Sequence, residues 1–127
     1  MSAEETLEVA RSYHRAWTTT KDFDAAAKLL SEDLQTDLPV NAYAGKREFV
    51  EAIRGFGALV SRVEMLSECA SPGEAVLVYD LEMAPLGVLR IAEQYTVVNG
   101  EITFIRQVHD TATMRAAGFA PALPATA

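Results

Sequence analysis

Apolar and polar residues alternate along residues 100–110, and this alternation predicts a β-strand that leaves a turn at Asn99-Gly100. Both faces of the strand mix apolar with polar side chains, so both are expected to be at least half buried. A glutamine and a histidine on one largely apolar face indicate a cavity wall rather than an ordinary core. The two faces carry Ile102, Phe104, Arg106, Val108 and Asp110 on one side, and Thr103, Ile105, Gln107 and His109 on the other.

Helical and strand periodicities divide the rest of the chain into a helix, a second helix, a short strand, a third helix and then a run of antiparallel strands. Ser2 and Glu5 form a capping box that starts the first helix, which is expected to end in Thr18-Thr19-Thr20. The order predicts an α+β domain whose helices cover one face of a sheet. The further elements are helices over residues 23–31 and 46–57, strands over 34–38, 60–68, 75–83 and 88–98, and a helical turn over 111–117.

Composition narrows the partners and the compartment. The chain has 127 residues, a net charge of -7 and a pI near 4.7, which argues against nucleic acid or an anionic membrane as a partner. No apolar run approaches the ~20 residues of a membrane span. The single Cys69 fits a reducing compartment, and the first residues, MSAEETLEV, lack the pattern of a signal peptide. We therefore expect a cytoplasmic protein.

A succession of short motifs, spread over nearly the whole chain, resembles the nuclear transport factor two-like superfamily. This superfamily includes the SnoaL-like polyketide cyclases, the ketosteroid isomerases and the limonene epoxide hydrolases. The resemblance implies a cone-shaped fold with three helices on the concave side of a curved, mostly antiparallel sheet, a small-molecule pocket and a homodimer through the outer sheet face. The SnoaL-like domain would span residues 1–118, followed by a loose tail over 119–127. The motifs are Tyr-His-Arg-Ala-Trp (13–17), Lys-Asp-Phe-Asp (21–24), Ala-Gly-Lys-Arg-Glu-Phe (44–49), Ala-Glu-Gln-Tyr-Thr-Val (92–97) and Asn-Gly-Glu-Ile-Thr-Phe-Ile-Arg (99–106).

The resemblance also predicts which faces of the last two strands point inward. Ketosteroid isomerases carry an Asp-His-Phe pattern on the penultimate strand, facing the pocket, and Glu93-Gln94-Tyr95 matches it here. A three-residue loop, 98–100, would then pair Glu93 with Ile105 and turn Gln107 and His109 inward, with Gln107 one diagonal step from Glu93. A two-residue Asn-Gly turn is the alternative and would invert one strand relative to the other.

Two residues match catalytic positions of the ketosteroid isomerases, and a third lies one residue away from such a position. Tyr13 and Glu93 stand where those enzymes carry the phenol and the protonated acid of their oxyanion hole, a device that stabilises an enolate. Asp37 stands one residue away from the position of the general base, which directly precedes a proline in that family. The alternatives are a core aromatic for Tyr13 and an exposed strand-end acid for Asp37. A dry site would raise the pKa of Glu93.

The two histidines are expected to differ. His109 is the candidate imidazole of the cavity, able to act as a general acid or base with Gln107 as a further hydrogen-bond donor. The alternative is a rim or core histidine bonded to backbone. His14, beside Tyr13 on the helix, is expected at the surface.

The remaining candidates would line the pocket. Asp80 and Glu82 give one strand an acidic face, either as a polar pocket wall or as a solvated surface. Epoxide hydrolases of this fold place an Arg and an Asp there, with a second Asp where this chain has Gln107, so epoxide hydrolysis is disfavoured. The expected apolar lining comprises Trp17, Tyr43, Phe56, Tyr95 and Ile105.

Two main hypotheses follow for function. The first is a cofactor-free acid/base enzyme, an isomerase or aldol-type cyclase, that acts through an enolate on an apolar carbonyl or polyketide-like compound. The second is a ligand-binding or accessory domain of the same fold without chemistry, and a structural dimerisation module is a third possibility. The sequence shows no cluster with the spacing of metal ligands.

Overall fold

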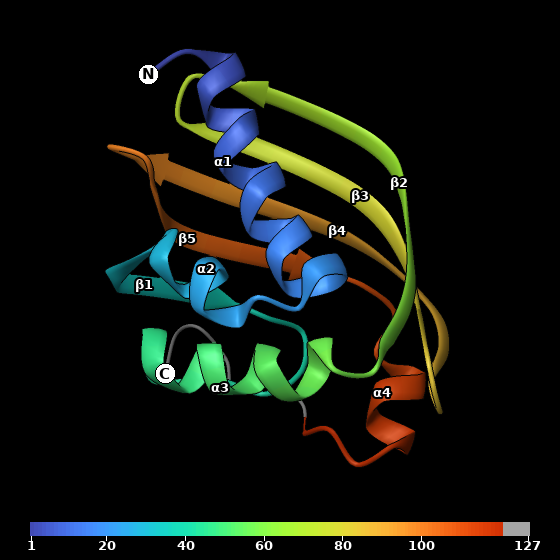
Figure 1. The fold of residues 1–127 in the computed structure, drawn as a ribbon. Helices are drawn as coiled ribbons and strands as arrows, with labels where there is room; N and C mark the ends of the chain where they lie inside the picture. The colour runs from blue at the N-terminus through green and yellow to red at the C-terminus, as the bar shows by residue number, and fades with distance from the viewer. Residues whose placement is uncertain (121–127) are drawn as a thin grey trace.

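The computed structural model describes residues 1–120 and shows the predicted order of two helices, a strand, a third helix and then a run of strands (Figure 1). Residues 121–127 of the predicted tail lie outside the described residues. The elements are α1 (Ala3–Arg15), the π-helix η1 (Ala16–Thr20), α2 (Phe23–Lys28), β1 (Leu30–Asp37), α3 (Lys46–Gly57), β2 (Val60–Ser71), β3 (Glu74–Met83), β4 (Gly87–Val98), β5 (Glu101–Val108) and α4 (Ala112–Ala116).

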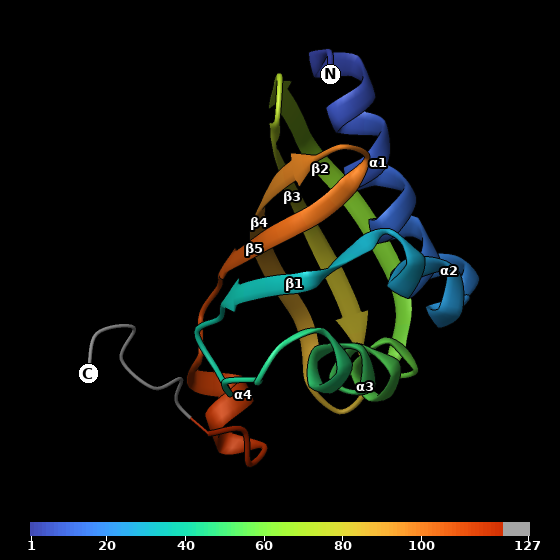
Figure 2. The same ribbon diagram turned by 90° about the vertical axis from the view of Figure 1, so that its left-hand side faces the viewer.

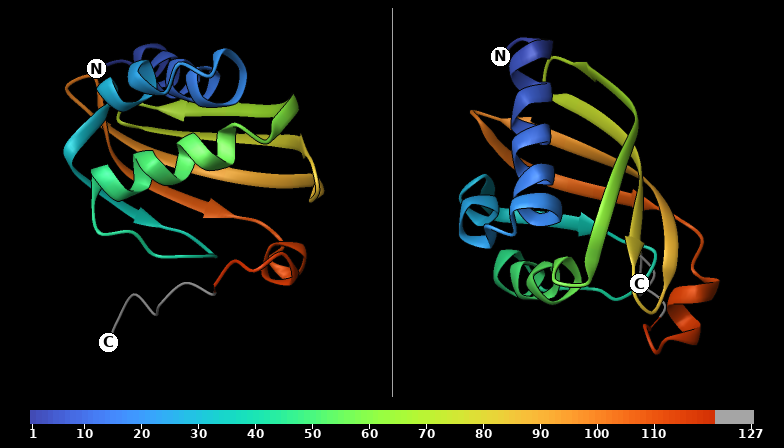
Figure 3. Two further views of the ribbon diagram at one scale, coloured as in Figure 1. Left: turned by 60° about the horizontal axis from the view of Figure 1, so that its bottom comes forward. Right: turned by 45° about the vertical axis from the view of Figure 1, so that its right-hand side comes forward.

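The five strands form one curved sheet in the order β1-β5-β4-β3-β2. All neighbours are antiparallel except β1 and β5, which run parallel. Helices α1, α2 and α3 cover the concave side, and α4 stands beyond the end of β5 (Figures 1 and 2). The predicted cone-shaped α+β fold is therefore confirmed, and the expected turn over residues 111–117 is a fourth, short helix. The curvature leaves the end of the sheet near α3 and α4 farthest from α1 (Figure 3).

Helix α1 begins as its sequence dictates and ends in an unforeseen way. The Ser2 hydroxyl accepts from the Glu5 backbone N–H at 3.0 Å while the Glu5 carboxylate accepts from the Ser2 N–H at 3.1 Å. The chain then continues into the π-helix η1, where the Thr18 hydroxyl donates to the His14 carbonyl at 2.6 Å. Lys21 closes the segment in the left-handed conformation with φ of 59°. This irregular turn carries Trp17, which is only 1% exposed.

The second helix is shorter and the first strand earlier than predicted. Helix α2 ends at Lys28, and β1 begins at Leu30, whose side chain is fully buried and whose backbone pairs with Ile102 of β5. Burial of this leucine against the sheet outweighs the helical propensity of the alanine-rich sequence before it. Strand β1 also contains an irregularity between Leu30 and Gln35.

The connection between β4 and β5 corrects the predicted loop while keeping the predicted faces. The turn has two residues, Asn99 and Gly100, with φ of 51° and 79°, so the expected three-residue loop is wrong. Such residues suit a two-residue turn, whose twist matches that of the strands. The extra residue is Thr103, where the pairing shifts between Thr96 and Val97. This bulge restores the register that keeps the apolar face inward.

His14 is buried, so its predicted surface position is wrong. The side chain is 4% exposed and packs against the Tyr79 ring at a centroid distance of 4.2 Å and against Trp17 at 6.0 Å. The concave sheet is wide enough to cover two adjacent positions of α1, which the single apolar stripe of the sequence did not indicate. Burial lowers the pKa of His14 from 6.5 to about 4.

The buried His14 predicts a loss of stability in mild acid. The unfolded chain binds a proton at this site below pH 6.5 whereas the folded chain binds it only below about 4. The contribution of neutral His14 is therefore complete above pH 6.5 and is lost as the pH falls towards 4. Urea unfolding of a His14→Leu variant should depend less on pH across this window than unfolding of the wild type. An identical pH dependence in the two proteins would contradict the burial of a neutral imidazole.

Candidate functional site

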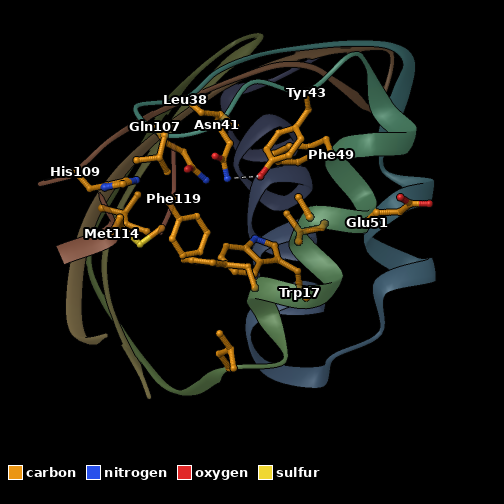
Figure 4. Close-up of a pocket in the computed structure, with 17 residues that line it drawn as sticks. Trp17, Leu38, Asn41, Tyr43, Phe49, Glu51, Gln107, His109, Met114 and Phe119 are labelled. Carbon is orange, nitrogen blue, oxygen red and sulfur yellow. Dashed lines mark hydrogen bonds between the residues drawn. The ribbon is translucent and has the colours of Figure 1, made fainter. Parts of the chain in front are cut away.

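A cavity of about 410 Å³ opens between α3, the loop after β1, α4 and the ends of β4 and β5. Its volume lies within the range of ordinary small-molecule pockets, and most of its wall is apolar or aromatic. The polar side chains at its wall are few, and Figure 4 shows several of them. The lining residues are Trp17, Leu38, Val40, Asn41, Tyr43, Phe49, Glu51, Ala52, Ile53, Gly55, Phe56, Leu59, Ile91, Gln107, His109, Met114 and Phe119.

Behind this wall, Glu93 is completely buried and surrounded by hydrogen-bond donors. Its Oε1 accepts from the Tyr79 hydroxyl at 2.8 Å and from the Tyr95 hydroxyl, and its Oε2 accepts from the Gln107 Nε2 at 2.7 Å. Tyr79 comes from β3, Glu93 and Tyr95 from β4, and Gln107 from β5. Glu93 lies directly opposite Gln107 in the ladder, not one diagonal step away as predicted.

Burial raises the pKa of Glu93 above its ordinary value, while the hydrogen bonds from Gln107, Tyr95 and Tyr79 act in the opposite direction. The pKa values of the phenols of Tyr13, Tyr79 and Tyr95 lie well above their usual range, mainly because of burial and then because of the neighbouring Glu93 charge. The cluster therefore favours neutral phenols around an acid whose protonated form is stabilised relative to water.

Gln107 connects this buried cluster with the cavity. Its amide is half-buried and lines the cavity, and one of its N–H groups is used by Glu93. An amide nitrogen has two hydrogens and its oxygen has two lone pairs. Gln107 therefore keeps one N–H and a carbonyl oxygen available to a bound molecule, in an orientation that Glu93 holds.

His109 lies on the same part of the wall, and its imidazole points into the cavity (Figure 4). The Nδ1 atom is 3.0 Å from the Asp110 carbonyl oxygen, which can only accept a hydrogen bond. Nδ1 must therefore carry the proton in the neutral ring, and Nε2 keeps its lone pair. This arrangement gives the cavity a potential base without a buried charge.

Three further predicted site residues lie in the wall or core behind the cavity rather than on its surface. Tyr13, Tyr95 and Ile105 are fully buried and are not among the lining residues. The rings of Tyr13 and Tyr95 meet edge to face at 5.9 Å. The Tyr13 hydroxyl has no hydrogen-bond partner among residues 1–120. The structure therefore brings Tyr13 beside the Glu93 cluster, but neither side chain reaches the cavity surface.

Three predicted acids point away from the cavity. Asp37 ends β1 and forms an ion pair with Arg106 at 2.8 Å, with half of its side chain exposed. Asp80 binds Arg90 through both carboxylate oxygens, at 2.8 and 3.0 Å, and Glu82 is exposed. The inward positions of β3 are its apolar ones, so the solvated alternative for the acidic face is the one observed.

The apolar lining was predicted in part. Trp17, Tyr43 and Phe56 line the cavity as expected, with the Trp17 and Phe56 rings 6.2 Å apart. Two further lining residues were not predicted, one in the same loop as Tyr43 and one at the end of the described chain. These are Asn41 and Phe119, the second of which was assigned to the tail.

Asn41 holds the C-terminal segment against the cavity. Its backbone N–H donates to the Ala120 carbonyl at 2.7 Å, and its Oδ1 accepts from the Ala120 N–H at 3.0 Å. Its Nδ2 donates to the Tyr43 hydroxyl at 3.1 Å, as drawn in Figure 4. Between these contacts and α4, Phe119 packs edge to face on Phe56 at 6.2 Å. Phe119 thus lines the cavity and Ala120 is hydrogen-bonded to Asn41, whereas both residues were expected in a loose tail. A positive φ of 56° at Asn41 suits an asparagine and was a possible sequence signal.

An Asn41→Ala variant is expected to loosen this segment. The substitution removes two side-chain hydrogen bonds, each contributing about 1 kcal/mol, at a position where alanine is also strained. Amide hydrogen exchange at residues 112–120 should accelerate about tenfold while exchange in β3 and β4 stays unchanged. Unaltered exchange at residues 112–120 would show that the Asn41 side chain does not retain the segment.

Within residues 1–120, no group of three or more His, Cys, Asp or Glu side chains is arranged to hold a metal ion. No described helix is both long enough and apolar enough to span a membrane.

Comparison with known proteins places this geometry in a broad structural group. A protein from Kribbella flavida is 30% identical, with 88% of this chain and 92% of that chain covered and a TM-score of 0.82. An NTF2-like protein of unknown function from Cytophaga hutchinsonii is 19% identical, covering 87% and 94%, with a TM-score of 0.72. A proposed ketosteroid isomerase from Kribbella flavida is 18% identical, covering 87% and 81%, with a TM-score of 0.75. No family model and no curated protein matches the chain.

Proposed function

Because this chain has the fold of the NTF2-like proteins, we propose that its cavity binds a small, largely apolar carbonyl compound and catalyses cofactor-free acid/base chemistry on it. The proposed reaction passes through an enolate and is either an isomerisation or an aldol-type cyclisation. The fold alone does not select this activity, since one scaffold carries many functions. The proposal therefore depends on the site.

The observation that supports the proposal most is the placement of His109 and Gln107 on one wall of an otherwise apolar cavity. Each side chain is held from behind, His109 by the Asp110 carbonyl and Gln107 by Glu93. Positioned polar groups in a water-poor site are effective because they need little reorganisation during the reaction. The two catalytic residues of the proposal are therefore His109 and Gln107.

In the proposed reaction, His109 Nε2 removes a proton from the carbon next to the substrate carbonyl. The electron pair of that C–H bond moves into a carbon–carbon double bond, and the carbonyl oxygen becomes the enolate oxygen. The free N–H of Gln107 donates to this oxygen. Protonated His109 then returns the proton to carbon, at the same or a conjugated position. Glu93 acts through Gln107 as a positioning residue.

Deuterium exchange tests this proposal without knowledge of the natural substrate. The bicyclic ketone trans-1-decalone, incubated with the protein in D2O, should exchange the hydrogens beside its carbonyl faster than in buffer containing an equal concentration of imidazole. Nuclear magnetic resonance of the ketone measures the rate directly. Exchange no faster than in imidazole buffer would argue against enolisation in the cavity.

Ligand binding without chemistry is the second candidate function. It is favoured by the position of Glu93 and Tyr13, which match catalytic residues of the ketosteroid isomerases yet lie behind the cavity wall. Asp37, matched to the general base, faces outward. Saturable binding of trans-1-decalone without deuterium exchange would select this alternative.

We also propose that the protein forms a homodimer through the outer face of the sheet and resides in the cytoplasm. The outer face carries exposed valines at positions 88, 98 and 108. Sedimentation of the purified protein tests the dimer, with a monomer at micromolar concentration as the contradicting result.

A further inference from the structure

Three polar side chains of the cavity wall, Asn41, Gln107 and His109, each make at least one hydrogen bond within the protein. Both functional groups of the Asn41 side chain are used, as are His109 Nδ1 and one N–H of Gln107. Trp17 differs from these residues. Its indole Nε1 is buried and has no acceptor among residues 1–120, although the residue lines the cavity.

An unpaired buried donor is costly because it has lost its hydrogen bond to water without replacement. The indole cannot easily rotate to find a partner, since Trp17 is 1% exposed and is held between His14 at 6.0 Å and Phe56 at 6.2 Å. Figure 4 shows its nitrogen on the edge turned towards Asn41 and Tyr43, well separated from His109. Tyr13 and His14 also carry unpaired atoms, but neither residue lines the cavity.

We propose that the Trp17 indole N–H donates a hydrogen bond to a second oxygen of the bound molecule. The substrate would then be an apolar compound with two oxygen functions. One is the reacting carbonyl at His109 and Gln107, and the other is a carbonyl or similar acceptor at the opposite side of the cavity. This inference rests on the proposed function for the first oxygen and adds Trp17 as a specificity-determining residue.

The two sides of the cavity place different chemical requirements on the two oxygen functions of the ligand. At His109 and Gln107, the free lone pair of Nε2, the amide N–H and the amide oxygen can serve either a carbonyl or a hydroxyl group. At Trp17 only a donor is offered, so the second group must accept. A ligand that presents a hydroxyl hydrogen or a methyl group there would leave the indole unsatisfied.

Two ketones with the same ring skeleton provide the test. Trans-1-decalone has one oxygen, and trans-decalin-1,5-dione has a second at the far end. Since Trp17 is the only tryptophan in the 127-residue chain, fluorescence and the single indole resonance of nitrogen-15-labelled protein both report on this side chain. We expect the dione to bind about fivefold to tenfold more tightly than the monoketone and to move the indole proton resonance downfield.

Two variants distinguish the loss of the indole hydrogen bond from a change in the shape of the cavity wall. Calorimetry measures the affinity for both ketones, because Trp17→Phe removes the fluorophore. Trp17→Phe keeps an aromatic ring without the donor and should abolish the preference for the dione. Phe56→Leu alters the neighbouring apolar wall and should weaken both ketones by similar factors. A dione preference that survives in Trp17→Phe would overturn the assignment of the donor.

The outcomes also distinguish this inference from the proposed function. Equal wild-type affinities with an unmoved indole resonance would overturn the second-oxygen inference, even if trans-1-decalone still exchanges deuterium. A dione preference with a shifted resonance but no exchange would support the Trp17 contact and count against the proposed chemistry. Failure of both ketones to bind at millimolar concentration would overturn both.

Discussion

A Glu93→Ala variant is expected to lose about 4 kcal/mol of unfolding free energy. The substitution removes the acceptor of three hydrogen bonds and leaves the Tyr79, Tyr95 and Gln107 donors in a dry core. It also creates a cavity where the side chain is completely buried. The loss is a large fraction of the stability of an ordinary domain. Urea unfolding followed by circular dichroism measures it.

Two control variants identify the cause of that loss. Glu82→Ala removes an exposed acid from the neighbouring strand and should change stability by less than about 0.5 kcal/mol. Glu93→Gln keeps the shape and can still accept from both tyrosines, while rotation of the Gln107 amide restores the remaining bond. It should therefore keep most of the stability. A Glu93→Ala loss below about 1 kcal/mol would contradict the role assigned to the cluster.

The raised pKa of Glu93 also fixes the sign of a pH effect. Between the unfolded and folded pKa values the folded chain binds more protons, so this site stabilises the fold fully below the unfolded pKa. The contribution is lost as the pH rises through the folded pKa. Relative to Glu93→Gln, the wild type should therefore become less stable as the pH increases. A difference that is independent of pH would mean that the Glu93 pKa is unshifted.

A His109→Gln variant is expected to exchange the hydrogens of trans-1-decalone at least about 100-fold more slowly than the wild type. Glutamine occupies a similar space and can form hydrogen bonds, but it cannot take up a proton. Binding of the ketone should change little because the apolar wall is intact. The exchange rate at saturating ketone and the dissociation constant together separate lost chemistry from lost binding.

Glu51 provides the matched control for His109. Glu51 also lines the cavity, and its carboxylate could in principle act as a base. However, this carboxylate is turned outward in Figure 4, and its Oε1 lies 4.0 Å from the Arg47 Nε. Glu51→Gln should therefore alter the exchange rate by less than about twofold. If Glu51→Gln slows exchange as much as His109→Gln, the base has been misassigned.

The fold was predictable because its signals are local and agree with one another. The capping box at Ser2, the alternating strands and the Asn99-Gly100 turn each specify one element. The inward orientation of Glu93 and Gln107 was also anticipated, since cross-strand partners share a face. The device that produces this orientation was not anticipated. The predicted three-residue loop takes its extra residue from β4, whereas the observed bulge at Thr103 takes it from β5, and either one leaves Glu93 and Gln107 on the same face.

Several residues of the candidate site were predictable from the local sequence, including the loop residue Tyr43. Gln107 and Trp17 follow strand and helix periodicity, and both line the cavity. Asn41 and Phe119 reach it through backbone contacts between segments far apart in the chain, which no periodicity encodes. The sequence also does not indicate how far behind the cavity wall an inward-facing residue lies. Glu93 points inward as predicted, but Gln107 stands between it and the cavity.

The stereochemistry of deuterium exchange tests the central claim most directly. Of the two carbons beside the carbonyl of trans-1-decalone, the CH2 carbon carries two inequivalent hydrogens, and a base fixed in the wall can reach one face of a bound ketone more easily than the other. We predict that the protein exchanges one of them in strong preference, beyond the ratio found in imidazole buffer, and that His109→Gln removes this preference. The same ratio with protein as with imidazole would contradict proton transfer by His109 within the cavity.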